Sequence, residues 1–316
     1  MKWVQRLRRT TLFDNIYKSR MARSFFNYLI RTYSKAFCLL AKGLSTIGRK
    51  HPYPSENNAN INLILITVAF NNDLLINKQI ELVKQFISDD DYQHIIIDNS
   101  TRKKMRKRIA SLCKKNDIEY IAIPHMVSWL AAKNIYANGY SHGCALNWTY
   151  RFVIKPRNPE VFMLLDHDLF PLKDISVKER LGTNDFLGVR REPSREWYLW
   201  PGWSIFRLNS IANYKPDFMP LYVKKQYLDS GGSMYKRVFR HYNINTIEFP
   251  TTRTLRIKQT KGLKLGNDIY HGDCIQFIDE TWLHLINGSN CAHIKGKETF
   301  VKHIIDNIPK VQAMLK

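Results

Sequence analysis

Two carboxylates stand at the end of an apolar run of strand length. Residues 161–165 read Val-Phe-Met-Leu-Leu, and Asp166 and Asp168 follow with one residue between them. Residues two apart on a strand share one face, and at the end of a strand both side chains can reach past the sheet edge. Carboxylate oxygens suit a hard cation such as Mg²⁺ or Mn²⁺. We therefore expect Asp166 and Asp168 at a sheet edge, where such a cation would hold a diphosphate.

The same pattern also has a purely structural explanation. An Asp at this place can close a strand by forming an Asx-type turn with nearby backbone. A second Asp-x-Asp match, Asp89-Asp90-Asp91, lies in a polar stretch before another strand, and we interpret it as a solvated loop. What distinguishes Asp166 and Asp168 is the apolar strand before them and the Leu-Phe-Pro segment after them.

The expected elements that position these residues alternate between strands and helices. Apolar runs predict strands near 61–70, 94–98, 118–123 and 161–165, and helices over 74–87, over 102–115 and after Ser141. Strands without polar alternation, separated by helices, indicate a mostly parallel sheet covered on both faces. After residue 170 the pattern loosens, and we expect short strands near 186–189, 204–208 and 241–249.

The charge balance demands an anionic partner. The chain has 316 residues and a formal net charge of +22, which suits nucleic acid, an anionic membrane leaflet or a phosphorylated substrate. Residues 1–55 hold twelve Lys or Arg and one acid, Asp14, with aromatic and aliphatic residues at roughly helical spacing over 1–50. Such a basic amphipathic helix can lie in a membrane interface, or it can pack on the rest of the chain. Residues 51–58 resemble a linker.

The cysteines and the apolar runs point to the cytoplasm. The five Cys are scattered, odd in number and without metal-binding spacing, which fits a reducing compartment. No apolar run approaches the ~20 residues that span a bilayer, and the basic N-terminus lacks the apolar core of a secretory signal. We expect a cytoplasmic protein, peripheral on the cytoplasmic membrane face.

Three more segments place small or polar residues where a ligand could bind. The first strand ends Thr67-Val-Ala-Phe-Asn71 without the glycine-rich loop of dinucleotide-binding or P-loop enzymes. The second ends at Asp98, which could accept a hydrogen bond from a base imide or a ribose, or could cap a turn. Gly143, before the expected helix, would let a ligand approach the backbone closely, or would serve an ordinary helix entry. Asn147 lies within that helix.

In this order the segments resemble the GT-A-fold glycosyltransferases and, more loosely, the large family-2 group. The resemblance covers roughly residues 60–175. It implies an α/β fold of GT-A type (Rossmann-like), a mostly parallel sheet flanked by helices. It also implies an enzyme that moves a sugar from a nucleotide diphosphate to a glycan or lipid-linked acceptor, with Mn²⁺ or Mg²⁺ as cofactor. A UDP-sugar would be the favoured donor and a GDP-sugar the second choice.

The resemblance also assigns roles to residues. The donor-binding residues would be Thr67, Val68, Asn71, Asp98, Gly143, Asn147 and Asp166. Asp168 would bind the metal directly, and Asp166 would bind it through water or would hold the ribose. A late histidine, His284, would complete the metal site, with His271 as the alternative. The general base would be Asp229, with Asp273 and Glu280 as rivals. Trp203 and Trp282 could stack on the acceptor sugar, although tryptophan more often belongs to a core.

These roles imply a division of the chain, and one rival function remains. We expect residues 1–55 to form a helical extension with its linker and 56–316 the catalytic domain, with a nucleotide-sugar half (56–175) and an acceptor half (176–316). The rival is a non-catalytic protein that binds nucleic acid or a membrane surface through its basic excess. The run Arg102–Arg108 would contact phosphates. It lacks interleaved aromatic residues and a recognised nucleic-acid module, so we expect no nucleic-acid partner.

Overall fold

The computed structural model describes residues 62–132, 139–192, 196–223, 226–256, 274–288 and 297–313. It also describes four helical, exposed residues near the N-terminus, namely Ala36, Leu39, Leu40 and Gly43. The rest of the predicted N-terminal helix, the predicted linker and the division at residue 55 lie outside the described residues, and these stay predictions.

A six-stranded sheet forms the centre of the molecule, in the order β3-β2-β1-β4-β7-β6. The first four strands of this order run parallel to one another, and β7 is antiparallel to both of its neighbours. The strands are β1 (Leu63–Ala69), β2 (Tyr92–Asp98), β3 (Glu119–Ala122), β4 (Val161–Asp166), β6 (Phe186–Arg191) and β7 (Tyr198–Arg207). The predicted fold class, a mostly parallel α/β sheet flanked by helices, is confirmed.

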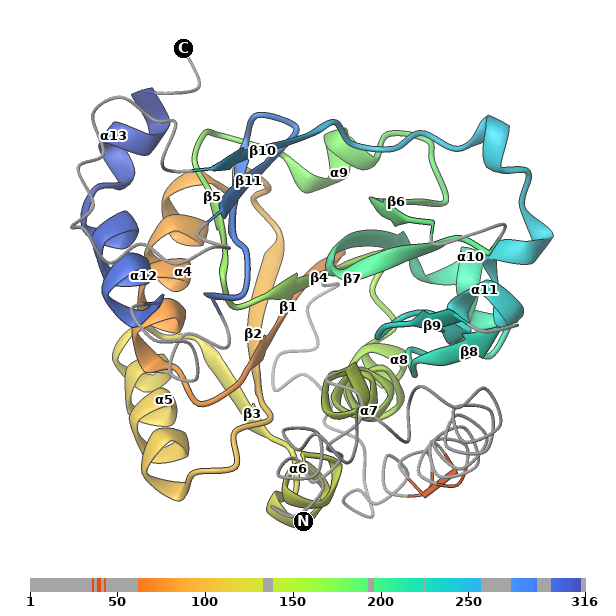
Figure 1. The fold of residues 1–316 in the computed structure, drawn as a ribbon, viewed down its shortest axis with the longest axis horizontal. Helices are drawn as coiled ribbons and strands as arrows, with labels where there is room; N and C mark the ends of the chain where they lie inside the picture. The colour runs from red at the N-terminus through yellow and green to blue at the C-terminus, as the bar shows by residue number, and fades with distance from the viewer. Residues whose placement is uncertain are drawn as a thin grey trace, which may run out of the picture.

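Helices cover both faces of this sheet, so β1 is buried along its whole length. Leu63 and Leu65 pack on one face in the same cluster as Val83, while Ile64 and Ile66 pack on the other with Trp148. The helices of the first face are α4 (Asp73–Phe86), α5 (Lys103–Lys115) and α9 (Val177–Leu181). Those of the second are α6 (His125–Ala131), α7 (Gly139–Thr149), a π-helical turn η1 (Tyr150–Ile154), α8 (Lys155–Arg157), α10 (Leu208–Ala212) and α11 (Ser233–Arg237) (Figure 1).

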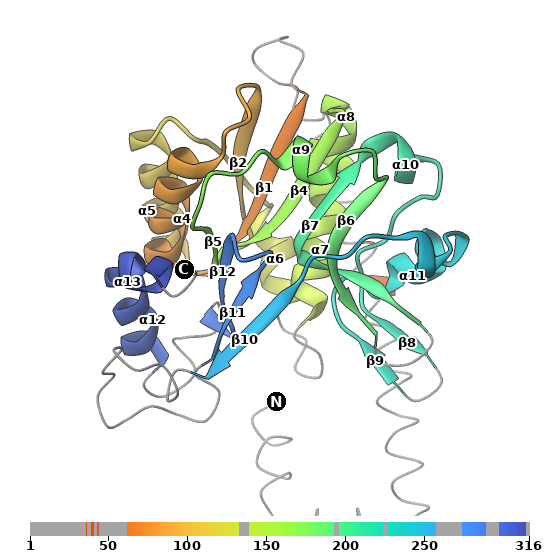
Figure 2. The same ribbon diagram turned by 90° about the horizontal axis from the view of Figure 1, so that it is seen from above.

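The strand that follows β4 along the chain belongs to a second sheet. Its strands follow the order β10-β11-β12-β5, with antiparallel pairing throughout. They are β5 (Leu169–Pro171), β10 (Thr252–Arg256), β11 (Cys274–Ile278) and β12 (Trp282–Leu285). Helices α12 (Lys297–Asp306) and α13 (Ile308–Ala313) pack on this sheet together with α4 (Figure 2). A separate hairpin, β8 (Leu221–Val223) and β9 (Gln226–Leu228), completes the strands described. The chain therefore passes from one sheet to the other within the two residues between β4 and β5.

Two local expectations were wrong. Residues 241–249 form no strand; the segment holds 3₁₀ turns at η2 (Phe239–His241) and η3 (Ile244–Thr246). Asp89 does not lie in a solvated loop but is buried. Its carboxylate accepts hydrogen bonds from the backbone N–H groups of Val177 and Lys178, at 2.6 and 3.2 Å, at the start of α9. The second Asp-x-Asp match is thus a helix cap.

No helix within the described residues is long and apolar enough to cross a membrane.

Candidate active site

The turn between β4 and β5 carries Asp166 and Asp168, and a buried amide holds it from below. The Gln79 side chain, on α4, donates hydrogen bonds to the carbonyl oxygens of Asp166 (2.8 Å) and Leu169 (2.7 Å). These two carbonyls bracket the turn. Gln79 is fully buried, so solvent does not compete for its amide. The geometry of the turn therefore depends on a residue that belongs to no motif of the sequence.

A chain of hydrogen bonds fixes the orientation of this amide. Thr67 Oγ1 donates to Gln79 Oε1 at 2.7 Å, and His94 Nε2 lies 2.9 Å from the same hydroxyl. Because the hydroxyl hydrogen goes to Gln79, His94 must donate from Nε2. Burial lowers the pKa of His94 to about 3, so its ring is neutral. The prediction that Thr67 binds the donor is wrong, because its side chain is fully buried beneath the turn.

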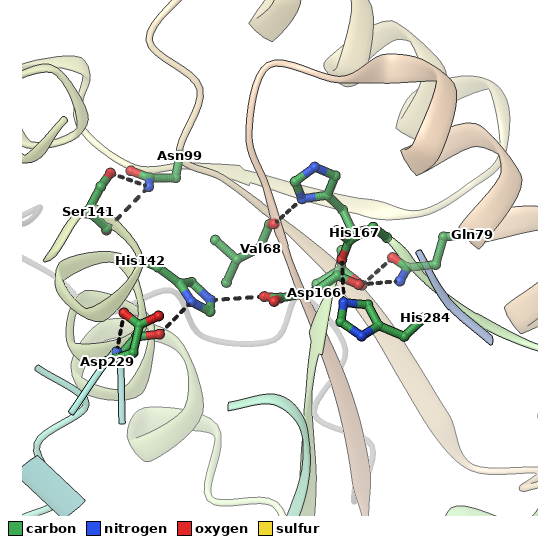
Figure 3. Close-up of polar contacts among 12 residues, drawn as sticks. Val68, Gln79, Asn99, Ser141, His142, Asp166, His167, Asp229 and His284 are labelled. Carbon is green, nitrogen blue, oxygen red and sulfur yellow. Dashed lines mark hydrogen bonds and ion pairs between the residues drawn. The ribbon is translucent and has the colours of Figure 1, made fainter. Parts of the chain in front are cut away.

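The two aspartates diverge from the turn instead of sharing one face. Asp166 Oδ1 lies 3.3 Å from His142 Nε2, on α7. Asp168 is almost fully buried, and its Oδ1 lies 3.9 Å from His284 Nε2. His284 reaches this place because β12 pairs with β5, which sets it opposite Leu169. The structure therefore brings together Asp168 and His284 but turns Asp166 toward a histidine that the sequence did not indicate. Figure 3 shows His142 facing Asp166.

The electrostatics of the turn favour a bound cation. Burial raises the pKa of Asp166 to about 8, and the charges of Asp168 and Asp229 act in the same direction while His167 opposes them. Burial lowers the pKa values of His142 and His284 to about 4, against the pull of the nearby carboxylates. Both imidazoles are thus neutral near pH 7, and a cation would relieve the repulsion among the carboxylates.

The donor atoms near the turn suit a divalent cation. Among the described residues, no three His, Cys, Asp or Glu side chains form a ready metal-binding group. Asp168 Oδ1 and His284 Nε2 stand 3.9 Å apart. A carboxylate oxygen and an imidazole nitrogen at this separation would both be available to a single divalent cation.

Asp229 borders the site on the side of His142. His142 Nδ1 lies 3.2 Å from Ser230 Oγ, and Asp229 Oδ1 accepts a hydrogen bond from Ser230 N at 2.8 Å. A Cβ on Gly139 would lie 1.8 Å from Asp229 Oδ1, so only glycine there lets the carboxylate sit against α7. Asp229 is exposed. Figure 3 shows His142 between Asp229 and Asp166.

One rival candidate for the base is held by an arginine. Glu280 sits in the turn between β11 and β12, where Arg253 binds it and lowers its pKa. Its role as a base stays a prediction. Asp273 and His271 lie outside the described residues, and their roles stay predictions.

The two predicted acceptor-binding tryptophans are core residues, so that prediction is wrong. Trp203 and Trp282 are both fully buried, and their ring centroids lie 6.2 Å apart. The aromatic residue at the site is Trp200, which is partly exposed. Its ring lies 4.6 Å from that of His284, with the Arg191 guanidinium 5.3 Å from its centroid. Gly202 leaves room for this ring: a Cβ there would lie 2.2 Å from it and 2.6 Å from Asp166 Oδ2.

The loops after β1 and β2 are tied to each other by polar side chains. Asp98 is fully buried; its Oδ1 accepts from Ser100 N and its Oδ2 from Tyr120 Oη, both at 2.7 Å. Both oxygens are thus engaged within the fold, which does not support the predicted role of Asp98 in reading a base. Asn71 has a positive φ of 51°, and its Oδ1 accepts from Thr101 N at 3.2 Å. The side chain of Val68 packs in the core.

Gly143 and Asn147 serve the packing of α7, so their predicted contacts with the donor are wrong. Gly143 lies inside the helix and not before it. A Cβ there would lie 2.6 Å from the carbonyl oxygen of Phe218, so the close approach is to the chain's own backbone. Asn147 donates to Asp217 Oδ1 at 3.0 Å and accepts from Phe218 N at 2.8 Å. The amide thus holds the segment after α10.

Comparisons with known proteins add little to this geometry. No family model and no curated protein matches the chain. Among solved structures, it is similar to the mannosyltransferase PcManGT from Pyrobaculum calidifontis in complex with GDP-Man and Mn²⁺, at 12% identity and a TM-score of 0.33, over 63% of this chain and 57% of that one. It is also similar to the galactosyltransferase LgtC in complex with donor and acceptor sugar analogs, at 14% identity and a TM-score of 0.35, over 46% and 58% of the two chains.

A third similar structure is the mannosyltransferase Ktr4p from S. cerevisiae, at 9% identity and a TM-score of 0.36, over 57% of this chain and 69% of that one. The chain spans less than two thirds of the length of the first two proteins. Likenesses at this level do not establish an activity, so function rests on the site itself.

Proposed function

We propose that this protein is a glycosyltransferase that moves a sugar from a nucleotide diphosphate to an acceptor hydroxyl. The observation that carries the proposal is the turn at the end of β4. It places Asp168 beside His284 and Asp166 beside His142, with Asp229 at the border. The turn lies at the carboxyl end of a parallel strand, where open α/β sheets bind ligands. An acidic site in a chain of net charge +22 suits an anionic ligand that arrives with a cation.

Asp168 and His284 would hold the divalent cation, Mn²⁺ or Mg²⁺, with Asp166 contributing through water. When bound, such a cation stabilises the charge that develops on the leaving diphosphate. Gln79 keeps the turn in place through the carbonyls of Asp166 and Leu169. The ring of Trp200, beside His284, offers an apolar face to a sugar.

Asp229 would act as the general base that deprotonates the acceptor hydroxyl. Its Oδ1 accepts from Ser230 N, so Oδ2 is the atom that would take the proton. The side chain is exposed, which lets an acceptor approach it from solvent. General-base catalysis contributes about 10²–10⁴-fold, so Asp229→Asn should lower kcat by that range while donor binding persists.

The test is metal-dependent donor hydrolysis and transfer by Asp168→Asn and a matched control. Asp168→Asn keeps the shape of the side chain but removes its charge, so both activities should fall at least 100-fold. Asp90→Asn alters an exposed aspartate of the second Asp-x-Asp match and should change neither. Full activity of Asp168→Asn, or undiminished activity in EDTA, would rule out the metal-dependent mechanism.

The donor and acceptor classes are proposed on the sequence resemblance over residues 60–175 alone. A UDP-sugar is the first choice and a GDP-sugar the second, and the acceptor would be a glycan or a lipid-linked sugar. Both oxygens of Asp98 are engaged within the fold, so the choice would come from elsewhere in the pocket. A thermal-shift series of UDP, GDP, CDP and ADP with Mn²⁺ would identify the nucleotide, because a ligand stabilises the folded state by mass action.

We also propose that the protein works at an anionic membrane surface on the cytoplasmic side. Residues 1–55, with twelve basic residues and one acid, support this proposal. Each Lys or Arg near such a surface contributes ~1 kcal/mol.

A further inference from the structure

Helix α5 presents a strongly basic surface. Residues 102–115 contain eight Lys or Arg and no acid. Arg106 is used within the fold, since its guanidinium donates to the carbonyl oxygens of Ser100 and Ile123, both at 2.7 Å. The remaining cations of this segment are exposed, namely Arg102, Lys103, Lys104, Lys107, Arg108, Lys114 and Lys115. The basic surface is therefore an outer face of the catalytic domain itself.

Large apolar side chains are exposed beside the first turn of α5. On α6, Met126 is 55% exposed and Trp129 is 46% exposed; Leu74, at the start of α4, is 39% exposed. Helix α6 is joined to α5 directly: Arg106 Nη2 donates to Ser128 Oγ at 2.9 Å, and His125 Nε2 lies 3.0 Å from the Thr101 carbonyl oxygen. Figure 1 shows α6 and the first turn of α5 at one end of the molecule.

The beginning of α4 belongs to the same end. The backbone N–H of Asn71, two residues before α4, donates to Ser100 Oγ at 2.7 Å, and Asp73 lies 3.5 Å from the guanidinium of Arg108. These contacts join the starts of α4, α5 and α6, which carry exposed apolar and exposed basic side chains. We call this region the α5–α6 surface. It is defined by Leu74, Arg102, Lys103, Lys104, Met126 and Trp129.

We propose that the α5–α6 surface docks on an anionic lipid bilayer. Its cations are complementary to anionic headgroups, and tryptophan is enriched at the interface between membrane and water. A nucleic acid fits less well, because the exposed Met126 and Leu74 side chains gain nothing from phosphates and sugars. Burial of these two side chains among lipid headgroups and acyl chains removes apolar surface from water.

Docking in this way orients the candidate active site toward the membrane. The register sets Asp98 of β2 opposite Ala69 of β1 and Ala122 of β3, and sets Asp166 of β4 opposite Val68. The strand ends that lead to α5 and α6 therefore lie on the same sheet edge as the Asp166–Asp168 turn. A lipid-linked acceptor would meet the site at that edge. This consequence rests on the proposed function, whereas the docking itself does not.

Two pairs of lysines on the same helix make a matched test. Full-length protein is mixed with neutral vesicles and with vesicles that contain phosphatidylserine, and partitioning is measured at 100 mM salt. Lys103→Gln with Lys104→Gln should weaken binding to the anionic vesicles by about 25-fold, about fivefold for each charge. Lys114→Gln with Lys115→Gln removes the same charge about 16 Å away along the helix. This distance exceeds the ~10 Å Debye length, so the effect should be several-fold smaller.

A second variant tests the apolar part of the surface. Met126→Ser with Trp129→Ser should weaken vesicle binding about tenfold, whereas Tyr214→Ser, which changes an exposed aromatic residue near α10, should not.

Hydrogen exchange locates the contact independently of residues 1–50. Exchange of the backbone amides of residues 125–131 should slow on anionic vesicles, while that of residues 208–212 should not change. Equal losses for the two lysine pairs, or unchanged exchange of α6 in bound protein, would overturn the proposal. The proposal would also be overturned if the protein bound an RNA duplex more tightly than vesicles and the same variants weakened the binding to RNA. An unchanged midpoint of thermal unfolding for each variant shows that it is folded.

Discussion

The side-chain amide of Gln79 donates hydrogen bonds to the carbonyl oxygens of Asp166 and Leu169, one at each end of the turn that carries Asp168. Thr67 and His94 stand behind it and fix its orientation. None of these three side chains is exposed to a ligand, yet they determine where the two aspartates lie. At the scale of single residues, the site therefore depends on a buried polar chain that links β1, β2, α4 and the turn.

We predict that Gln79→Ala lowers both stability and turnover. It leaves two buried carbonyl oxygens without a donor, each costing ~1–3 kcal/mol, so the free energy of unfolding in urea should fall by about 2–6 kcal/mol. If the amide positions the turn, kcat should also fall at least tenfold at a temperature where the variant is folded. Gln312→Ala is the control, because it removes one side-chain hydrogen bond to the carbonyl oxygen of Leu172, away from the site. If Gln79→Ala is less stable but its kcat is unchanged, the amide stabilises the fold and does not position the turn for catalysis.

His94 should make the protein sensitive to acid. Its pKa is lowered from 6.5 to about 3 by burial, with the charge of Lys84 acting in the same direction. Between these values the unfolded chain binds a proton that the folded chain does not, so stability is complete above about pH 6.5 and is lost as the pH falls toward 3. The loss at pH 5 should be about 2 kcal/mol.

Urea unfolding at pH 7.5 and pH 5 measures this effect. The difference in stability between the two pH values should shrink by about 2 kcal/mol in His94→Gln but not in His241→Gln, which changes an exposed histidine. Equal differences in the wild type and in His94→Gln would show that other groups govern the acid response.

At the scale of elements, the sequence predicted β1, β2, β3 and β4 well because their apolar runs are continuous and bounded by polar residues. It did not predict the second sheet, whose strands are three to five residues long and in which β5 pairs with β12 across more than a hundred residues of chain. For the same reason the sequence could suggest His284 only through resemblance; its place beside Asp168 follows from the pairing of β5 with β12.

Element context also explains why the structure does not support some of the predicted site residues. The carboxylate of Asp98 and the ring of Trp203 sit at strand positions whose spacing fits a ligand site and a core equally well. Only the neighbours decide: Tyr120 and Ser100 occupy the oxygens of Asp98, and Trp282 packs on Trp203. Those neighbours come from other elements, and single-sequence periodicity carries no information about them.

Helix α9 provides a test of the role found for Asp89. Its carboxylate accepts from Ser176 Oγ at 2.9 Å and from two backbone N–H groups at the helix start. Charge-assisted caps of this kind contribute ~1–2 kcal/mol, so Asp89→Ala should lower the free energy of unfolding by about that much or slightly more. Asp90→Ala, next to it and exposed, should stay within about 0.5 kcal/mol of the wild type. Equal effects for the two variants would contradict the cap.

At the scale of the whole molecule, charge is segregated. The formal net charge is +22, yet the Asp166–Asp168 turn gathers carboxylates. Over α5 the basic excess is at the surface, while the acids of the site lie beside neutral histidines. A cation at the turn would therefore meet a local negative field, and an anionic surface at α5 would meet a positive one.

This segregation predicts how salt and truncation act on membrane binding. Removing residues 1–50 takes away most of the N-terminal cations, so binding to anionic vesicles should weaken strongly while donor hydrolysis persists. The α5–α6 surface should still bind weakly, and Trp129→Ser in the shortened chain should abolish that remainder. Raising salt from 50 to 300 mM shortens the screening length from about 14 to about 6 Å, so co-sedimentation of the full chain should fall steeply. Salt-insensitive binding would instead mean that apolar insertion dominates, and unchanged binding after truncation would exclude residues 1–50 as a membrane contact.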